Sequence, residues 1–312
     1  MKKISILIPC FNEEENIEKI VVALKEMFAK DLSNYDYELL FIDNASTDKS
    51  QQIIQKICNE DTKIKAIFNV RNFGQFNSPY YGLFQTTGDG VVILSCDFQD
   101  PISVIPELVA EWEKGCKIVI TKKKKSDEKV WMRFMRKLYY RIAKKFSEVH
   151  QIEDFTGFGL YDREFLDVLK KIDDPTPFLR GLVAEFGYKI GEVSYDRPAR
   201  AAGKTKNNFY SLYDAAMLSF TSYTKVGLRV ATFSGVMIAI MSFIIGLIYL
   251  VMKLINWDSF SAGMAPMLIG VFFLGAVQLF FIGFLGEYIM AINERVKHRP
   301  LVIEEKRINF DK

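Results

Sequence analysis

The sequence has no long apolar segment after Met1, few cysteines and little net charge, and each shortage narrows the possible functions. Without an apolar segment behind Met1, no signal peptide is expected. The four cysteines, Cys10, Cys58, Cys96 and Cys116, form no CxxC pair, so a paired-cysteine metal or redox motif is not indicated. They are predicted to be reduced, mostly buried packing residues, consistent with a cytosolic domain. A net charge of +3 is too small to indicate a nucleic-acid partner.

Charge is also missing from two long runs, Val230 to Met252 and Met264 to Gly286. Each exceeds the ~20 apolar residues that cross a bilayer as a helix, so a two-helix transmembrane hairpin is predicted. The alternative, a pair of buried core helices, is disfavoured because core helices rarely run this long without a charge. Basic residues flank the hairpin and are sparse in its linker, so both ends of the chain are expected in the cytoplasm. These residues are Lys225 and Arg229 before the hairpin, and Arg295, Lys297, Arg299, Lys306 and Arg307 after it.

The first part of the chain alternates short apolar strands with helical stretches. Strands are predicted at 3–9, 37–43, 64–68, 90–96 and 117–121, and helices near 76–87 and 102–114. Two further helices are expected to begin at Asn12 and at Ser46 or Thr47, whose side chains can cap them. This order predicts an α/β fold with a doubly wound, mostly parallel sheet and helices on both faces. Ligands bind beyond the carboxyl ends of such strands, where Asn12, Asp43 and Asp97 lie.

A basic amphipathic stretch follows the last of these strands. Bulky apolar residues from Trp131 to Phe146 fall at helical spacing, with arginines and lysines between them. Such a helix can lie in a membrane interface, and the alternative is an ordinary helix packed on the domain core. Beside a transmembrane hairpin the interface is favoured. The aromatic residues between Phe209 and Tyr223 suit a second interfacial segment just before the first span.

Four short motifs occur in order along the sheet region. They are Pro9-Cys10-Phe11-Asn12-Glu13, Asp43-Asn44-Ala45-Ser46-Thr47-Asp48, Arg71-Asn72-Phe73-Gly74 and Asp97-Phe98-Gln99-Asp100-Pro101. With the hairpin and the ending Gly286-Glu287-Tyr288-Ile289 and Arg299-Pro300, the chain resembles the inverting family 2 glycosyltransferases of the GT-A (Rossmann-like) fold. More narrowly, it is similar to the dolichyl- and undecaprenyl-phosphate sugar synthases of the bactoprenol glucosyltransferase type. The resemblance covers nearly the whole chain.

The resemblance implies a nucleotide-sugar donor, most simply a UDP-sugar. Asp43 matches the residue that accepts a hydrogen bond from the uracil edge. Pro9, Asn12 and Glu13 match residues beside the nucleoside, and Arg71 belongs to a turn whose usual Lys-Glu is replaced here by Gln75-Phe76.

A divalent cation, Mg²⁺ or Mn²⁺, is expected because the charge on a departing diphosphate needs a hard cation on oxygen ligands. Asp97 and Gln99 supply two such oxygens, and the alternative for Asp97 is a turn-forming role before Pro101. The family motif reads Asp-x-Asp-x-Gln-Asp-Pro, and Ser95 replaces its first acid. Ser95 either ligates through water or leaves a two-ligand site. On this reasoning Ser95→Asp is expected to be tolerated and to tighten metal binding.

The acceptor is expected to be polyprenyl phosphate, because later segments also resemble the family. Asp154-Phe155-Thr156-Gly157-Phe158, Phe178-Leu179-Arg180-Gly181 and the run Arg197 to Lys206 carry this likeness. Arginine and lysine hold and orient a phosphate through charge-assisted hydrogen bonds. Arg133, Arg180, Arg200 and Lys206 are therefore the candidate ligands of the acceptor phosphate, with a surface salt bridge as the alternative for each. Asp154 is the candidate orienting residue at the reacting centre. A phosphate oxygen is already anionic, so displacement with inversion needs no strong base.

Two rival functions differ in class. A processive polysaccharide synthase is disfavoured because no Gln-x-x-Arg-Trp motif occurs. A non-catalytic membrane scaffold on a decayed transferase fold has Ser95 as its main support, and the retained Asp97, Gln99 and basic acceptor residues argue against it. The favoured hypothesis divides the chain into a cytoplasmic transferase domain (1–204), an interfacial segment (205–228), two transmembrane helices (229–290) and a cytoplasmic tail (291–312). The expected location is the cell membrane, with a homo-oligomer as one possible assembly. No residue identifies the sugar.

Overall fold

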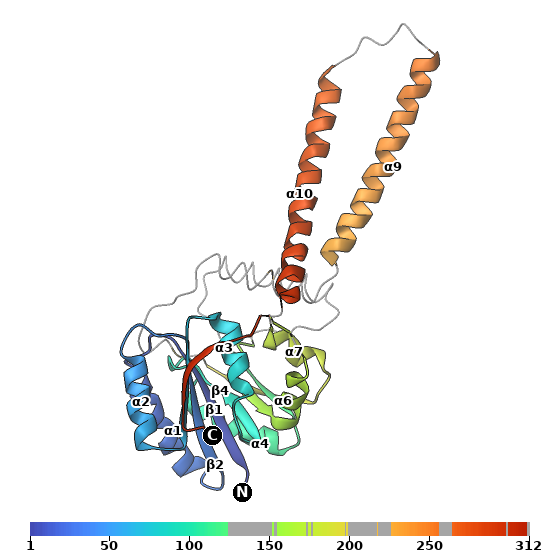
Figure 1. Ribbon diagram of the computed structural model, residues 1–312. Helices are drawn as coiled ribbons and strands as arrows, with labels where there is room; N and C mark the ends of the chain where they lie inside the picture. The colour runs from blue at the N-terminus through green and yellow to red at the C-terminus, as the bar shows by residue number, and fades with distance from the viewer. Residues whose placement is uncertain are drawn as a thin grey trace.

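The computed structural model describes residues 1–123, 152, 155–172, 174–175, 177–196, 198, 217, 226–255, 264–297 and 299–310. A layered α/β domain carries two long helices that project from one end of it (Figure 1). The strands are β1 Lys3–Cys10, β2 Asp36–Asp43, β3 Ile64–Asn69, β4 Gly90–Ile93, β5 Ile118–Lys123, β6 Gly159–Asp162, β7 Ile190–Tyr195 and β8 Glu304–Ile308. The helices are α1 Ile17–Asp31, α2 Ser50–Glu60, α3 Gly74–Leu83, α4 Ile105–Glu113, α6 Arg163–Lys170, α7 Leu179–Glu185, α9 Val226–Ile255 and α10 Met264–Val296, with a 3₁₀ turn at Ile102–Val104.

The strands form one sheet in the order β7-β5-β6-β4-β1-β2-β3-β8. All run in the same direction except β6 and β8, which pair antiparallel with their neighbours. The sheet is therefore mostly parallel, as predicted, with one antiparallel strand inside it and another at its edge.

Both faces of the sheet are covered, because the central strands are apolar at almost every position. In β1, Ile4, Ile6 and Ile8 pack with residues of α1, α2 and α4, whereas Leu7 packs with residues of α3, α6 and α7. Successive side chains of a strand point to opposite faces, so a strand buried on both sides has to be continuously apolar. The doubly wound architecture predicted from the alternation of elements is confirmed.

The cysteines and the boundaries of the elements test the finer predictions. All four cysteines are free and at most 4% exposed, as predicted. The helix predicted to begin at Asn12 begins instead at Ile17, and the one assigned to Ser46 or Thr47 begins at Ser50. The reason is tertiary: these polar side chains bond across to the neighbouring turn rather than capping their own helices. The strand predicted at 90–96 ends at Ile93, and the helices predicted at 76–87 and 102–114 span Gly74–Leu83 and Ile105–Glu113.

Glu38 is a buried carboxylate near the amino ends of the strands. It accepts hydrogen bonds from Ser5 Oγ and from the Thr87 amide and hydroxyl, and Lys65 Nζ lies 3.0 Å from its Oε2. Burial alone raises the pKa of this carboxyl, but the bonds from Ser5, Thr87 and Lys65 outweigh it and lower the pKa to about 2. Glu38 therefore fastens β1, β2, β3 and the Thr87 turn together as an anion.

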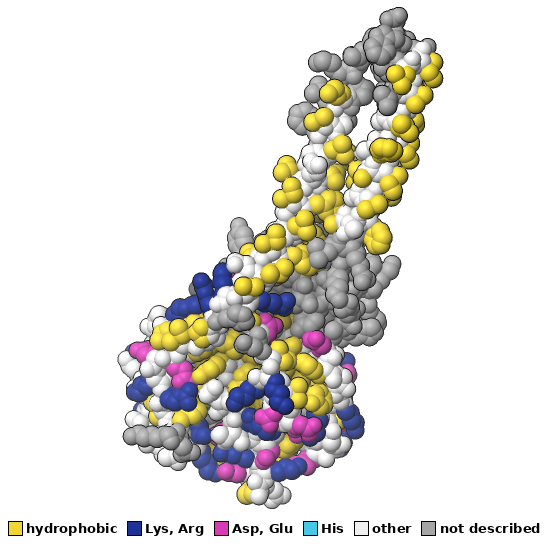
Figure 2. All heavy atoms as spheres, turned by 45° about the vertical axis from the view of Figure 1, so that its right-hand side comes forward, with side chains coloured by type: hydrophobic (Ala, Val, Ile, Leu, Met, Phe, Trp, Pro, Cys, Tyr) yellow, Lys and Arg dark blue, Asp and Glu magenta, His cyan; other side chains and the backbone are white. Residues whose placement is uncertain are grey.

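The two charge-free runs lie within α9 and α10, which have 30 and 33 residues. At 1.5 Å per residue they are about 45 and 50 Å long, enough to cross a hydrocarbon core of about 30 Å. In the described part of the chain, the segments apolar enough to span are Val230–Ile248 and Phe273–Val296, one within each long helix. Figure 2 shows hydrophobic side chains along both helices and basic side chains gathered where they meet the sheet domain. Residues 256–263 of the linker lie outside the described residues, as do both predicted interfacial segments apart from Met217.

One element has no counterpart in the sequence analysis. Residues 304–308, which follow α10, form β8 and add an antiparallel edge strand to β3. The segment assigned to a tail thus returns from the two long helices to the sheet.

Candidate active site

Three turns at the carboxyl edge of the sheet share an unusual backbone geometry. Asn12, Ala45 and Phe98 follow the ends of β1, β2 and β4 and have φ angles of 57°, 61° and 58°. Positive φ is uncommon outside glycine, and for a bulky side chain such as Phe98 it is a true outlier. Strained backbone of this kind is concentrated at functional sites. The strand register sets the turns side by side, since Cys10 is paired with Asp43 and Leu7 with Ile93.

The first two turns are bonded to each other through side chains. Asn12 Oδ1 accepts from the backbone amide of Thr47 at 2.7 Å, and the backbone amide of Asn12 donates to Ser46 Oγ at 2.8 Å. The Glu13 amide donates to Ser50 Oγ at 2.9 Å. The predicted donor residues Asn12 and Glu13 are therefore held against the turn that follows Asp43, and Pro9 lies in β1 opposite Ile42.

Asp43 is fully buried at the end of β2. Its Oδ2 accepts from the Ser46 amide at 3.0 Å and from Gln51 Nε2 at 2.8 Å. The carboxylate therefore shapes its own turn, whereas the sequence analysis expected Ser46 or Thr47 to cap a helix beginning there. The hydroxyl of Ser46 serves Asn12 instead.

A further turn follows β3 at residues 70–73 and is the third of four along the chain, so the turn with Phe98 is the fourth. It is built from asparagines that sequence reasoning largely passed over. Asn44 Nδ2 donates to Asn72 Oδ1 at 2.9 Å, and Asn44 Oδ1 accepts from Asn69 Nδ2 at 3.2 Å and from the Phe73 amide at 2.9 Å. The sequence analysis noted the motifs that contain Asn44 and Asn72 but assigned no role to either residue. Arg71 is exposed on this turn, with its guanidinium 4.1 Å from the centre of the Phe73 ring.

The fourth turn contains the predicted metal residues. Asp97 is 6% exposed, and its Oδ1 accepts from the Gln99 amide at 3.1 Å. Ser95 Oγ donates to Asp100 Oδ2 at 2.5 Å, and the Tyr195 hydroxyl donates to Asp100 Oδ1 at 3.2 Å. Ser95 is therefore engaged with Asp100, and through Asp100 the turn is joined to the end of β7. Nothing in the sequence indicated the part played by Tyr195.

The pKa values of two buried thiols, Cys96 and Cys10, are raised by burial and by nearby acids of these turns. Burial raises the pKa of Cys96, and the charges of Glu13 and Asp97 raise it further. Burial likewise raises the pKa of Cys10, followed by the charges of Asp43, Cys96 and Glu13. The carboxylates of Glu13 and Asp97 therefore lie near Cys96, and those of Asp43 and Glu13 lie near Cys10. An anionic diphosphate can approach such a place only if a cation offsets the carboxylate charge.

The donor set suits a metal bound together with its substrate. Among the described residues, no group of three or more His, Cys, Asp or Glu side chains could hold a metal ion. Mg²⁺ commonly takes one or two carboxylates and completes its octahedron with phosphates and water. Asp97 and Gln99 fit that mode of binding.

The acceptor candidates are only partly within the described chain. Arg180 is exposed at the start of α7, and the neighbouring Phe178 ring packs edge-on against Phe76 of α3 at 5.8 Å between ring centroids. This contact sets Arg180 on the side of the third turn. Arg133, Asp154, Arg200 and Lys206 lie outside the described residues. β5 and β7, which precede the segments containing them, both end at the carboxyl edge of the sheet.

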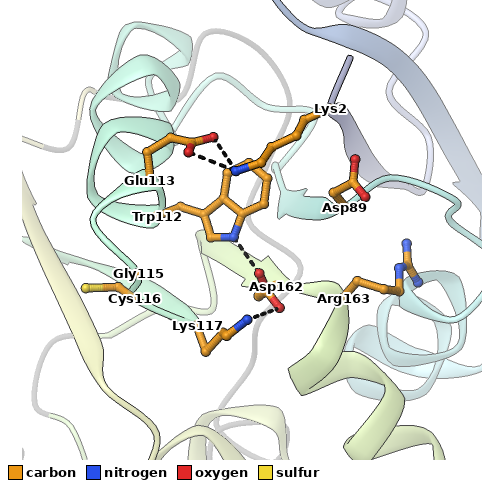
Figure 3. Close-up of a pocket in the computed structure, with 9 residues that line it drawn as sticks. All are labelled: Lys2, Asp89, Trp112, Glu113, Gly115, Cys116, Lys117, Asp162 and Arg163. Atoms are coloured by element: carbon orange, nitrogen blue, oxygen red, sulfur yellow. Dashed lines mark hydrogen bonds and ion pairs between the residues drawn. The ribbon is translucent and has the colours of Figure 1, made fainter.

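A recess at the opposite edge of the sheet is a different feature (Figure 3). It has a volume of about 370 Å³ and surrounds Trp112, whose Nε1 donates to Asp162 Oδ2 at 2.7 Å. Lys2 Nζ lies 4.6 Å from the centre of the Trp112 ring and bonds to Glu113. Because this recess lies at the amino ends of β1 and β4, its residues are remote from the four turns. Within it, Lys2 pairs with Glu113 and Lys117 with Asp162.

Known proteins resemble the chain along its whole length. Residues 5–169 match the family model described as glycosyl transferase family 2. The bactoprenol glucosyl transferase of Shigella phage SfX is 34% identical over 308 residues, which cover 98% of this chain and 99% of that protein. The prophage bactoprenol glucosyl transferase homolog of Escherichia coli (strain K12) is 33% identical over 304 residues, covering 96% and 98%. Among solved structures, glucosyl-3-phosphoglycerate synthase from Mycobacterium tuberculosis aligns with a TM-score of 0.49 at 20% identity, covering 70% of this chain and 76% of that one.

The family match includes more than half of the chain, and both relatives extend through α9 and α10. The chain therefore belongs to glycosyl transferase family 2. It is a glycosyltransferase with the GT-A fold, and the four turns at the carboxyl edge form its candidate active site.

Proposed function

We propose that the chain transfers a sugar from a nucleotide-sugar donor, a UDP-sugar, to polyprenyl phosphate at the cytoplasmic face of the membrane. The observation that carries this proposal is the orientation of the sheet. β8 runs antiparallel to β3 with Glu304 opposite Asn69, so the segment from α10 enters the sheet at its carboxyl edge. This is the edge with the four turns, and it faces the two long apolar helices (Figure 1). A transferase site turned toward a membrane hairpin suits an acceptor that is itself a lipid.

The donor is assigned to the first, second and fourth turns. In this proposal Asp43 recognises the base, Pro9, Asn12 and Glu13 line the nucleoside, and Arg71 borders the site. Asp97 and Gln99 hold Mg²⁺ or Mn²⁺, which offsets the charge of the departing diphosphate. The carboxylates of Glu13 and Asp97, which both lie near Cys96, support the need for that cation.

The acceptor phosphate is assigned to Arg133, Arg180, Arg200 and Lys206, with Asp154 orienting it at the reacting centre. The relatives named bactoprenol glucosyl transferase support a lipid-linked acceptor, since they align with this chain over nearly its full length. Because a phosphate oxygen is anionic at neutral pH, catalysis would depend on holding two anions in line. Direct displacement would invert the anomeric carbon.

The proposed topology puts the domain of residues 1–204 and the tail 291–312 in the cytoplasm, joined by the interfacial segment 205–228 and the spans within 229–290. The place of β8 supports this arrangement. Strands β1 to β7 precede α9 and β8 follows α10, and all belong to one sheet, so both ends of the hairpin lie on the same side of the membrane. A homo-oligomer remains one possible assembly of this unit.

The test uses the purified full-length chain in bilayer nanodiscs containing undecaprenyl phosphate. A panel of radiolabelled nucleotide sugars is offered with Mg²⁺, with Mn²⁺ and with EDTA. Transfer of one sugar to the lipid, dependent on the cation, is expected. Full activity in EDTA would remove the metal from the proposal, and no lipid product with any donor would refute the acceptor.

Asp97→Asn tests the proposed metal ligand. Asparagine keeps the side-chain oxygen that accepts from the Gln99 amide, so the turn is preserved while a charged ligand is lost. Transfer should fall roughly 100-fold or more, because a metal ligand supplies several kcal/mol of transition-state stabilisation and each ~1.4 kcal/mol is tenfold. Glu60→Gln, at an exposed acid on the last residue of α2, is the matched control and should retain the wild-type rate.

A further inference from the structure

The chain after α10 returns to the sheet domain at once. We refer to residues 299–310 as the strap. Leu301 packs against the apolar cluster on the α3 side of the sheet, and Val302 is 7% exposed. The Ile303 carbonyl accepts from the Val70 amide at 3.1 Å, just beyond the end of β3. The strap is therefore docked from Leu301 onward.

β8 and the residue after it fasten the strap along β3. β8 pairs with β3 from Asn69 opposite Glu304 to Ala66 opposite Ile308. Asn309, with a φ of 62°, donates its side-chain amide to the carbonyls of Cys58 at 2.7 Å and Ile64 at 2.8 Å. A third, longer bond reaches the Asp61 carbonyl at 3.4 Å, so the Asn309 side chain fixes the end of β8 against α2 and β3.

Side chains on either side of β8 add further attachments. Tyr81 of α3 donates its hydroxyl to Glu304 Oε1 at 2.8 Å. Phe310 lies under two cations, with Arg307 at 4.8 Å and Lys65 at 5.3 Å from the ring centre. The strap thus connects α10 to β3 and α3, the two elements on either side of the third active-site turn.

The reach between α10 and the docked strap is short. Only residues 297–300 separate Val296, the end of α10, from Leu301. A chain extends at most ~3.6 Å per residue, so the five steps from Val296 to Leu301 span at most about 18 Å. Beside them, Arg295 Nε lies 3.7 Å from Asp174 Oδ1. The end of α10 is therefore held close to the carboxyl edge of the sheet.

We propose that the strap is a fixed-length tether that sets the active-site edge of the sheet at the membrane surface. It acts as a positioning element for transfer to an acceptor in the bilayer, and it rests on the proposed function. An acceptor phosphate confined to the headgroup plane can meet the donor only if the domain keeps one height and tilt. Small errors in the placement of reacting groups cost large factors in rate.

The experiment lengthens the tether without touching β8. An eight-residue Gly/Ser insertion between Arg299 and Pro300 adds a root-mean-square reach of roughly 15 Å for a flexible chain. The same insertion between Ser33 and Asn34, in the exposed loop before β2, is the matched control. Full-length proteins in nanodiscs are assayed for transfer to undecaprenyl phosphate, and UDP binding is measured by calorimetry. A short-chain, detergent-soluble polyprenyl phosphate in micelles serves as an acceptor with no fixed plane.

The insertion at Arg299 should reduce transfer in bilayers at least tenfold. UDP affinity and transfer to the short-chain acceptor should stay within twofold of wild type, and the control insertion should change none of the three. The strap proposal is overturned if bilayer transfer is unchanged, or if UDP binding and short-chain transfer fall in parallel with it, since the segment would then serve only the stability of the sheet. If the wild-type chain transfers to neither lipid, the proposed function itself fails.

Discussion

Ser95 offers a test of how this active site manages its negative charge. Its hydroxyl donates to Asp100 Oδ2 at 2.5 Å, so Ser95→Asp replaces a donor with a second carboxylate beside the first. Two unit charges about 4 Å apart repel by about 4 kcal/mol at an effective dielectric constant of about 20. The family motif carries acids at both positions, and a pair of neighbouring carboxylates needs a proton or a cation between them.

The variant is therefore expected to depend on metal for its stability, whereas the wild type is not. In EDTA at neutral pH it should lose about 4 kcal/mol, which for a domain of this size lowers Tm by roughly 8–16 °C. A cation at 100 times its Kd restores about 2.7 kcal/mol. The sequence analysis expected Ser95→Asp to be tolerated and to tighten metal binding. The bond to Asp100 changes that expectation, because the variant should now keep its stability only when metal is present.

The assay is thermal unfolding of the full-length protein, first in EDTA and then across a titration of Mg²⁺ or Mn²⁺. Ser95→Ala is the matched control, because it removes the bond to Asp100 without adding charge. It should cost about 1–3 kcal/mol and respond to metal no more than wild type. A Ser95→Asp protein as stable as wild type in EDTA, or one that metal fails to rescue, would refute the reasoning.

Three further predictions concern the acceptor, the pH dependence and the topology. Arg200→Ala should raise the apparent KM for polyprenyl phosphate or lower the rate by roughly 10- to 150-fold, and Arg200→Lys should recover part of the loss. UDP binding, measured by calorimetry, should not change. Weaker UDP binding with unchanged lipid dependence would move Arg200 to the donor site. Glu38 has its pKa lowered to about 2, so its stabilisation is complete above the ordinary carboxyl pKa of 4.5 and is lost as pH falls toward 2. Between pH 4.5 and 2, the free energy of unfolding should fall by about 3 kcal/mol in wild type from this group and hardly at all in Glu38→Gln. The measurement is urea unfolding at several pH values. If the free energy of unfolding depends on pH equally in both proteins, the Glu38 network does not stabilise the fold in this way. A tag within 256–263 should react with an impermeant reagent from outside intact cells while tags at Met1 and Lys312 do not, and a protected linker tag would overturn the hairpin topology.

The elements that the sequence predicts well are those with a strong local signal. β1 to β3 were placed within a residue or two because buried parallel strands are continuously apolar. The two long helices follow from charge-free runs that each exceed the ~20 apolar residues of a bilayer-spanning helix. The motifs containing Asn12, Asp43 and Asp97 also needed no tertiary information, because the carboxyl ends of parallel strands always meet at one edge.

Tertiary structure decided the features whose signal is not local. Asn12, Ser46 and Thr47 can all cap helices, and only the register of β1 against β2 brings them into bonds with each other instead. The partnership of Ser95 with Asp100 and Tyr195 joins residues up to 100 positions apart, and no pattern in the sequence encodes it. β8 is the clearest case, because Glu304–Ile308 is largely charged and exposed, as edge strands often are. Its pairing uses backbone groups that every sequence has, so the return of the chain to β3 depends on where α10 ends in space.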